Sequence, residues 1–274
     1  MTEPILVKFE IQRFCPDRDV ASRWQEYSVP VKAGMTILDG LLETRNRLDP
    51  TLAWRFSCRM GVCGSCGMVI NGKPGLACNT QILNVSDSHI RLQPLANFDV
   101  VKDLVVDLGP MFEKHRAISP YIVHSDEQEA DMPAAEHEQR PADLLEYLQF
   151  AGCIKCGVCM AACPTLATDE RFLGPMPLTA LHRYNTDSRD AGFEQRRAAM
   201  SDFHAVSHCH YAAECSRACP KGVDPARAIQ LLKRDLVLAG LRLKRQRPSA
   251  RLLGPASARP RSGVPAAPPF DVER

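Results

Sequence analysis

The cysteines constrain this 274-residue chain more than any other feature, because all twelve except Cys15 fall into three groups with short, regular spacings. In secreted proteins such spacings indicate disulfides, whereas in a reducing compartment they indicate metal ligation. The N-terminal stretch MTEPILVKFEIQRF has neither the basic and apolar regions of a secretory signal nor the character of a transit peptide. We therefore predict a cytoplasmic chain whose grouped cysteines bind metal and whose lone Cys15 is a small packing residue.

The first cysteine group has the spacing C-x4-C-x2-C, followed by a fourth cysteine. Its members are Cys58, Cys63, Cys66 and Cys78. This is the spacing of the plant-type ferredoxins, in which four thiolates hold a 2Fe–2S cluster. Gly61, Gly64 and Gly67 lie between and beside these cysteines and let the backbone curl around a cluster with its N–H groups toward the sulfurs. A four-cysteine zinc site is the alternative, but such sites usually pair their cysteines at short spacing.

The second and third groups resemble each other. The second has the C-x2-C-x2-C-x3-C-P spacing of bacterial ferredoxins, and its members are Cys153, Cys156, Cys159 and Cys163. In two-cluster ferredoxins the fourth cysteine of such a run ligates the other cluster, which requires a partner run. The partner is Cys209-x5-Cys215-x3-Cys219, in which Ala212 stands where the second cysteine is expected.

Cross-ligation then predicts one complete and one incomplete cluster. The four thiolates of the first are Cys153, Cys156, Cys159 and Cys219, which suit a 4Fe–4S cluster. The second has only Cys163, Cys209 and Cys215, because Ala212 has no atom that binds iron. We therefore predict a 3Fe–4S cluster there. The alternative is a 4Fe–4S cluster completed by His208, His210 or water.

The apolar pattern predicts an α+β fold with two domains. Residues 5–11 and 25–31 alternate as strands around a turn at Pro16 and Asp17, a helix opens at Thr36, and residues 68–72 form a strand entering a hairpin. We expect a helix over 100–115, and helices from 142 onward, with Leu144, Leu145 and Leu148 on one face. The predicted segments are a 2Fe–2S domain (1–110), an acidic connection (111–141), a helical domain (142–240) and a disordered tail (241–274).

Charge is distributed unevenly along a chain of net charge +2. Residues 240–274 carry eight Lys or Arg against two acids, whereas residues 125–146 carry eight acids against Arg140. A basic tail can bind nucleic acid or anionic lipid, but a solvated tail is the simpler interpretation. No apolar run reaches the roughly 18 residues that cross a bilayer.

Four stretches carry a resemblance to a known family. They are SCRMGVCGSCGMVING, CIKCGVCMAACP, LTALHRYNTDSRD and CSRACPKGVDPARAI. Together with the order of the cysteine groups they resemble the iron–sulfur subunit of succinate dehydrogenase and fumarate reductase, from about residue 5 to residue 233. The resemblance implies an N-terminal β-grasp plant-type ferredoxin domain followed by an all-α bacterial-ferredoxin-like domain.

The resemblance also implies a function and its partners. The chain would pass electrons between FAD on a flavoprotein subunit, which holds the dicarboxylate site, and a quinone at a membrane anchor of the cytochrome b type. It would lie peripherally on the cytoplasmic face of the cell membrane. The chain lacks the G-x-G-x-x-G pattern of flavin-binding folds, which fits this division of labour.

Three positions match the family's quinone pocket: Pro164, His210 and Lys233. A protonated His or Lys beside a quinone oxygen stabilises the reduced anion or delivers a proton. His210 and Lys233 each have a simpler interpretation. His210 can shield the cluster, and Lys233 can lie on a solvated helix face. Family members that use ubiquinone commonly carry Trp shortly after the Cys-Pro pair, where this chain has Thr165 to Thr168. Together with residues 96–107, this favours the fumarate reductase branch and menaquinone.

Two other functions compete with this one. A redox subunit of another flavin-linked dehydrogenase or of a heterodisulfide reductase-like complex would usually have two complete cysteine runs or CCG motifs, which this chain lacks. A nucleic-acid-binding protein with a structural cluster would need a basic body, whereas the chain without its tail is acidic, and it would leave the first cysteine group unexplained.

Overall fold

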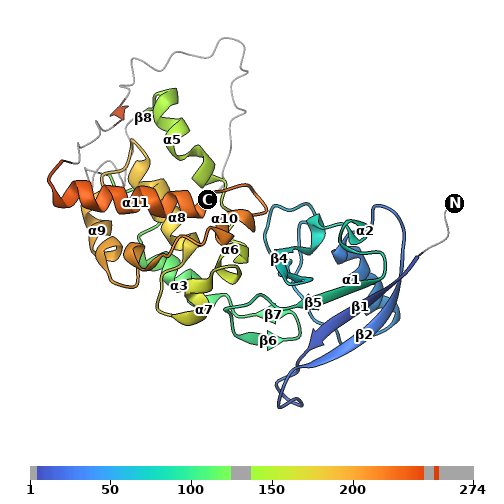
Figure 1. Cartoon of the computed structure of the whole chain (residues 1–274). Helices are drawn as coiled ribbons and strands as arrows, with labels where there is room; N and C mark the ends of the chain where they lie inside the picture. The colour runs from blue at the N-terminus through green and yellow to red at the C-terminus, as the bar shows by residue number, and fades with distance from the viewer. Residues whose placement is uncertain (1–4, 125–136, 244–249, 253–274) are drawn as a thin grey trace, which may run out of the picture.

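The computed structural model describes residues 5–124, 137–243 and 250–252, which form two bodies joined by a small hairpin (Figure 1). The first body is built on a sheet, and the second is helical. Their strands are β1 (Ile5–Arg13), β2 (Arg23–Val31), β3 (Gly67–Ile70), β4 (Lys73–Leu76), β5 (His89–Gln93), β6 (Val100–Lys102), β7 (Val105–Val106), β8 (His137–Glu138) and β9 (Arg251–Leu252). The predicted α+β class with a 2Fe–2S ferredoxin domain before a helical ferredoxin-like domain is confirmed.

The N-terminal sheet has five strands in the order β2-β1-β5-β3-β4. β1 pairs antiparallel with β2 and parallel with β5, while β3 is antiparallel to both β5 and β4. Side chains alternate along β1, so that Val7, Phe9 and Ile11 are fully buried between more exposed neighbours. The period-two pattern of the sequence therefore identified the buried face of this strand.

Helix α1 (Ile37–Arg47) packs against this sheet and begins at Thr36, as predicted. The Thr36 hydroxyl accepts the N–H of Asp39, and the Asp39 carboxylate accepts the N–H of Thr36, which forms a capping box. Gly40 lies against the ring of Phe9, since a Cβ at this position would be 2.5 Å from it. The missing side chain allows the close approach of helix and strand.

The helix predicted over residues 100–115 is wrong in its first half. Residues 100–106 form the β6–β7 hairpin, and α3 (Gly109–Ala117) begins only after it. Asp103 turns the hairpin with φ of 49° and accepts hydrogen bonds from Arg13 Nε at 2.9 Å and from Ala53 N at 2.9 Å. These contacts come from distant parts of the chain, so the local apolar pattern could not reveal them.

The remaining helices are mostly short and are found in both bodies. They are the 3₁₀ turn η1 (Ala77–Asn79), α2 (Ile82–Val85), α5 (Pro141–Ala151), α6 (Val158–Ala161), α7 (Pro164–Thr168), α8 (Pro175–Thr186), α9 (Phe193–Ser201), the 3₁₀ turn η2 (Val206–His208), α10 (Glu214–Arg217) and α11 (Pro225–Gly240). Helices α3, α5 and α11 contact α8, and Met111 and Ile118 of the α3 segment belong to the helical core. The boundaries at residues 110, 141 and 240 stay predictions.

The buried face of α5 is not the one that carries the leucines. Tyr147 and Phe150 face the core, whereas Leu144, Leu145 and Leu148 are exposed, Leu145 by 69 %. Phe150 packs edge-on against the ring of His182 on α8 with centroids 4.7 Å apart. The two aromatic side chains therefore decide which face of this helix is turned toward the core, and the leucines face solvent.

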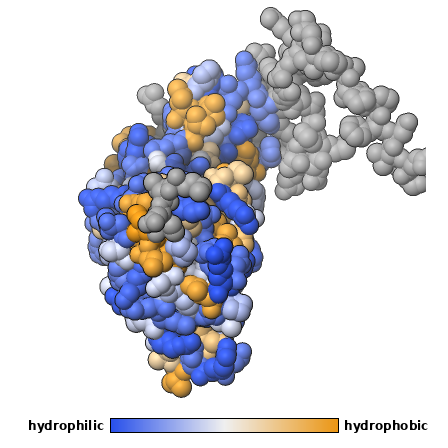
Figure 2. Space-filling model, turned by 90° about the vertical axis from the view of Figure 1, so that its right-hand side faces the viewer, coloured by the Kyte–Doolittle hydropathy of each residue, from blue (hydrophilic) through white to orange (hydrophobic). Residues whose placement is uncertain are grey.

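Residues 125–136 of the acidic connection and most of the basic tail fall outside the described residues. Within the described part, β8 and β9 pair antiparallel, with His137 opposite Leu252, so these tail residues form a strand where disorder was predicted. No helix in the described ranges combines the length and hydropathy that a bilayer crossing requires. The face seen from the side of the N-terminal body is mostly hydrophilic, with apolar side chains in small separate patches (Figure 2).

Candidate metal centres

The first cysteine group has an outer half that is open to solvent. The Cys58 sulfur accepts N–H groups from Cys63 at 3.2 Å, Val62 at 3.3 Å and Met60 at 3.5 Å. These hydrogen bonds, with that of Met60 first, lower the pKa of Cys58 to about 6. Gly61, with φ of 70°, allows the backbone to turn inside this loop. The loop is thus shaped to stabilise negative charge on sulfur, as a cluster requires.

The inner half of the same group is buried. Cys66 and Cys78 lie at the edge of the sheet core, and the Cys78 N–H donates to the Cys66 sulfur at 3.4 Å. Burial raises the pKa of Cys66 to about 12, with a further contribution from the nearby Cys78 and Cys63 thiols. Four thiols therefore converge at one place, which fits a 2Fe–2S cluster.

Four cysteines from two distant segments line one apolar cavity of the helical body. They are Cys153, Cys156, Cys159 and Cys219, joined by the side chains of Ile154, Met176 and Val223. Burial raises the pKa of Cys156 to about 11 and that of the fully buried Cys159 well above its ordinary value. Thiolates here are costly without a compensating positive charge, which cluster irons would supply. The predicted 4Fe–4S ligand set is thus brought together.

The three remaining cysteines line a second cavity. Cys163, Cys209 and Cys215 surround it together with Ala212 and Phe172. Ala212 occupies one corner, where the spacing predicted the missing cysteine. Among the described residues that line this cavity, neither His208 nor His210 is present. The three-thiol arrangement fits an incomplete cluster.

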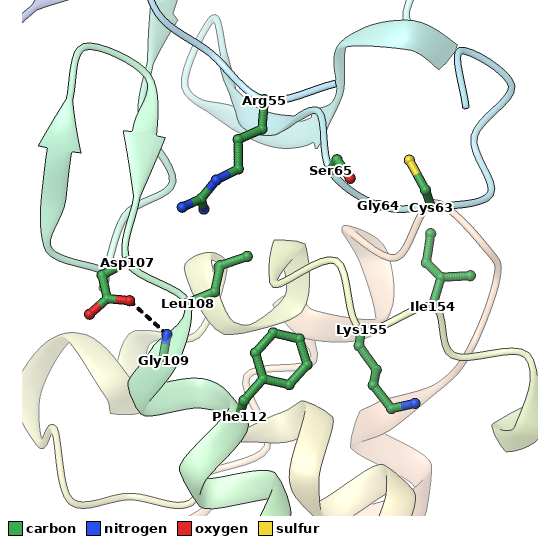
Figure 3. Close-up of a pocket in the computed structure, with 10 residues that line it drawn as sticks. All are labelled: Arg55, Cys63, Gly64, Ser65, Asp107, Leu108, Gly109, Phe112, Ile154 and Lys155. Atoms are coloured by element: carbon green, nitrogen blue, oxygen red, sulfur yellow. Dashed lines mark hydrogen bonds between the residues drawn. The ribbon is translucent and has the colours of Figure 1, made fainter. Parts of the chain in front are cut away.

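The first and second cysteine groups are in contact. Gly64, with φ of 76°, lies so close to the next loop that a Cβ on it would be 2.7 Å from Cys156 Cβ. Cys63 and Lys155 border a cavity of about 440 Å³ beside this contact (Figure 3). Arg55, Phe112 and Ile154 also line it, so it lies between the N-terminal body and the helical body. The sequence did not reveal this approach, because glycine spacing alone does not say what the loop touches.

Asn97 and Lys233 fix the loops around these cavities. Asn97, in the N-terminal body, donates from Nδ2 to the carbonyls of Met160 at 2.9 Å and Cys163 at 3.0 Å. Lys233, on α11, donates from Nζ to the carbonyl of Cys209 at 2.8 Å. Both residues hold the backbone of a cysteine loop, and only Lys233 was singled out individually from the sequence.

The three quinone-pocket candidates lie near the second cavity. Pro164 lines the cavity and is exposed, and His210 is exposed next to Cys209. Lys233 is half-buried through its contact with Cys209, so the solvated helix face considered for it does not describe its side chain. Cys15 is half-buried in the β1–β2 turn, away from the cysteine groups in sequence.

Comparison with protein-family models finds two matches. Residues 8–113 match the 2Fe-2S iron-sulfur cluster binding domain, and residues 149–223 match the 4Fe-4S dicluster domain. The chain is 43 % identical over 227 residues to a fumarate reductase iron-sulfur subunit of Mycobacterium tuberculosis, covering 83 % of this chain and 91 % of that one. It is 42 % identical over 246 residues to the subunit of the same name from Escherichia coli O6:H1, covering 88 % and 99 %.

A solved structure agrees. A chain of the Mycobacterium smegmatis Sdh1 complex in the apo form superposes with a TM-score of 0.75 at 25 % identity, covering 87 % of this chain and 98 % of that one. Sequence relatives, domain models and architecture thus point in one direction. The chain belongs to the family of fumarate reductase and succinate dehydrogenase iron–sulfur subunits, the electron-transfer chains of quinone-linked oxidoreductase complexes.

Proposed function

We propose that this subunit connects FAD on a flavoprotein partner to a quinone at a membrane anchor through three cluster sites in series. The single observation that carries the proposal is the grouping of its cysteines at one half-buried loop and around two cavities of the helical body. The bound clusters would supply one-electron chemistry. The chain's own part is to hold the sites close together, as the Gly64–Cys156 contact does, and to exclude water from the inner two.

The proposed ligand sets follow the sequence prediction. The 2Fe–2S site takes Cys58, Cys63, Cys66 and Cys78, and the 4Fe–4S site takes Cys153, Cys156, Cys159 and Cys219. The 3Fe–4S site takes Cys163, Cys209 and Cys215, because Ala212 leaves one corner of the second cavity without a ligand. These sets are supported by which thiols share a cavity or a loop.

The two ends of the series suit different partners. Met60 and Val62 expose apolar side chains on the 2Fe–2S loop, where a flavoprotein subunit would dock. Tyr211 and Phe203 expose aromatic rings around the other end, where a membrane anchor and its quinone would lie. With this arrangement the subunit would be peripheral on the cytoplasmic face of the membrane, held there by its anchor.

The quinone, which we propose to be menaquinone, would bind beside the second cavity. His210 is exposed there and is placed to hold or deliver a proton at a quinone oxygen. Lys233 would act at a distance by fixing the Cys209 carbonyl, since its ammonium already has that partner.

Electron paramagnetic resonance tests the proposal most directly. The chain would be purified without oxygen, together with whatever co-purifies, and its spectrum recorded before and after reduction. We expect about nine irons per chain and a narrow, near-isotropic signal in the oxidised sample, lost on reduction as a 2Fe–2S signal appears. About ten irons, no oxidised signal or zinc in place of iron would contradict the three-site proposal.

The substitution Ala212→Cys sharpens the same test. A thiol at the vacant corner should complete a 4Fe–4S site, raise the iron content by about one per chain and abolish the oxidised signal. Ala167→Cys, an exposed position on α7 that does not line the cavity, is the matched control and should leave both unchanged. Identical spectra for Ala212→Cys and the parent chain would contradict the 3Fe–4S assignment.

A further inference from the structure

A second constellation of metal-ligating side chains lies beside the Cys209 loop and is not used by the electron-transfer function. Asp169, His204 and His208 each offer one ligand atom, and the three atoms lie within 4.8 Å of one another. The Asp169 Oδ2 atom is 2.6 Å from His204 Nδ1 and 3.1 Å from His208 Nε2. Two imidazoles therefore converge on one carboxylate oxygen.

The three side chains are partly withdrawn from solvent and held by their surroundings. Their side-chain exposures are between 17 % and 20 %. Phe203 packs edge-on against His204 with centroids 5.1 Å apart and lies 5.2 Å from His208. Such packing limits the rotamers of both rings, which reduces the entropy that a bound ion would have to overcome.

The backbone around these side chains is also fixed. Asp169 ends α7, and its N–H donates to the Thr165 carbonyl at 2.9 Å. Leu173 N donates to the His204 carbonyl at 2.8 Å, which ties the two segments together. Lys114 donates from Nζ to the carbonyls of Glu170 and Phe172 and so holds the loop that follows Asp169. The triad thus rests on a framework that exists before any ion binds.

From this geometry we infer that Asp169, His204 and His208 form a binding site for a divalent transition-metal ion of the Zn²⁺ class. Two imidazoles and one carboxylate are the donors of open zinc sites, whereas Mg²⁺ and Ca²⁺ prefer oxygen ligands. Three protein ligands leave a further position for water. Ligand atoms around a tetrahedral zinc ion lie about 3.3 Å apart, so His204 Nδ1 would move away from Asp169 Oδ2 by about 0.7 Å and His208 Nε2 by about 0.2 Å.

The position of the site gives it a structural consequence. Asp169 lies six residues after Cys163, and His208 directly precedes Cys209. An ion bound by the triad therefore joins the two segments that carry thiols of the second cavity.

The test uses the full chain with its clusters, prepared without oxygen and with its iron content measured. It would be dialysed against micromolar Zn²⁺, after which bound zinc and iron are counted by mass spectrometry and the affinity is measured by calorimetry. We expect about one zinc per chain with no loss of iron, and Mg²⁺ in large excess should not displace it.

Two variants and one control assign the site. Asp169→Asn and His204→Ala should each weaken zinc binding at least about tenfold while iron content and circular dichroism stay unchanged. His89→Ala, an exposed histidine on β5, should bind zinc like the parent chain. If His204→Ala loses iron, the assignment depends on zinc binding by Asp169→Asn, whose side chain is nearly the same size and shape as that of the parent chain. Absence of zinc from the parent chain, or equal binding by Asp169→Asn, overturns the inference.

Discussion

The two bodies of this subunit place their cysteines differently with respect to their cores. In the N-terminal body, Cys63 is exposed and Cys58 half-buried, whereas Cys66 and Cys78 belong to the sheet core. In the helical body none of the described cysteines is exposed, and Cys159 and Cys215 are themselves members of the core. The first site therefore lies half in its core and half toward solvent, whereas the sites of the helical body have no exposed thiol.

The difference shows two ways to manage charge on sulfur. On the solvent side of the first site, backbone N–H groups lower the pKa of Cys58 to about 6, although burial raises the pKa of Cys66 on its inner side to about 12. The helical body lets burial raise the pKa of Cys215 to about 11, so thiolate there depends on the irons it binds. We therefore expect the sheet body to keep its fold without a cluster and the helical body to require one.

The largest expected effect comes from Cys159→Ser. A buried ligand is lost, so the helical body should lose its 4Fe–4S cluster and its cooperative fold, measured as iron content and helical circular dichroism. Cys63→Ser is the matched variant on the exposed loop and should lose only the 2Fe–2S signal. Equal loss of helical structure in both variants would contradict the comparison.

A second substitution tests whether the sheet body is stabilised by its own buried ion pairs and not by a cluster. Arg13 is 4 % exposed and pairs with Asp103 at 2.9 Å and Asp49 at 2.6 Å. Asp103→Ala leaves a buried guanidinium without its most buried partner and should cost about 3 kcal/mol of unfolding free energy. Fluorescence of the two tryptophans, both in this body, would follow the transition.

The control for Asp103→Ala is Glu26→Ala, because the Glu26–Lys8 pair is exposed. Its effect should stay below about 1 kcal/mol. The helical body should retain its iron in both variants. Release of iron from the helical body by Asp103→Ala would contradict the expectation that the sheet body and the helical body are stabilised separately.

Gly64→Ala should have a smaller effect on stability, and it should also slow electron transfer between the first two cluster sites. The substitution strains a backbone with φ of 76° by about 1–2 kcal/mol and pushes the 2Fe–2S loop away from Cys156. Gly72→Ala has a similar φ of 79° but open space around it. Gly64→Ala should be destabilised more than Gly72→Ala, because its Cβ also clashes with Cys156. Only Gly64→Ala should slow electron transfer between the first two sites, measured by rapid freeze-quench and electron paramagnetic resonance.

The smallest expected effect is a pH dependence of the sheet body. Burial raises the pKa of Asp49, but hydrogen bonds from Thr51, Tyr27 and Arg13 outweigh it and hold the pKa well below the ordinary 3.8. A lowered pKa gives stability that is complete above the unfolded value and is lost as the pH falls toward the folded one. Asp49→Asn should therefore differ most from the parent chain at pH 7 in urea unfolding, and the difference should begin to shrink only as the pH falls below about 4.

Spacing and alternation predicted much of the molecule because they act locally. Three features depend on neighbours within a few residues: the alternation of buried and exposed side chains along β1, the Thr36 cap, and the hairpin turn at Asn71 and Gly72. Local pattern failed where distant partners intervened. Asp103 turns a hairpin because Arg13 binds it, and α5 buries Phe150 against His182 and leaves Leu145 outside.

The sequence by itself determined the cysteine groups, the vacancy at Ala212 and the family, because ligand spacing along a loop is a local property that the chain carries unfolded. Only the tertiary structure decided which loops meet. The approach of Gly64 to Cys156, the hold of Lys233 on Cys209 and the triad of Asp169, His204 and His208 join segments far apart in sequence. Such contacts depend on how helices and sheet pack, and packing is set by the whole core at once.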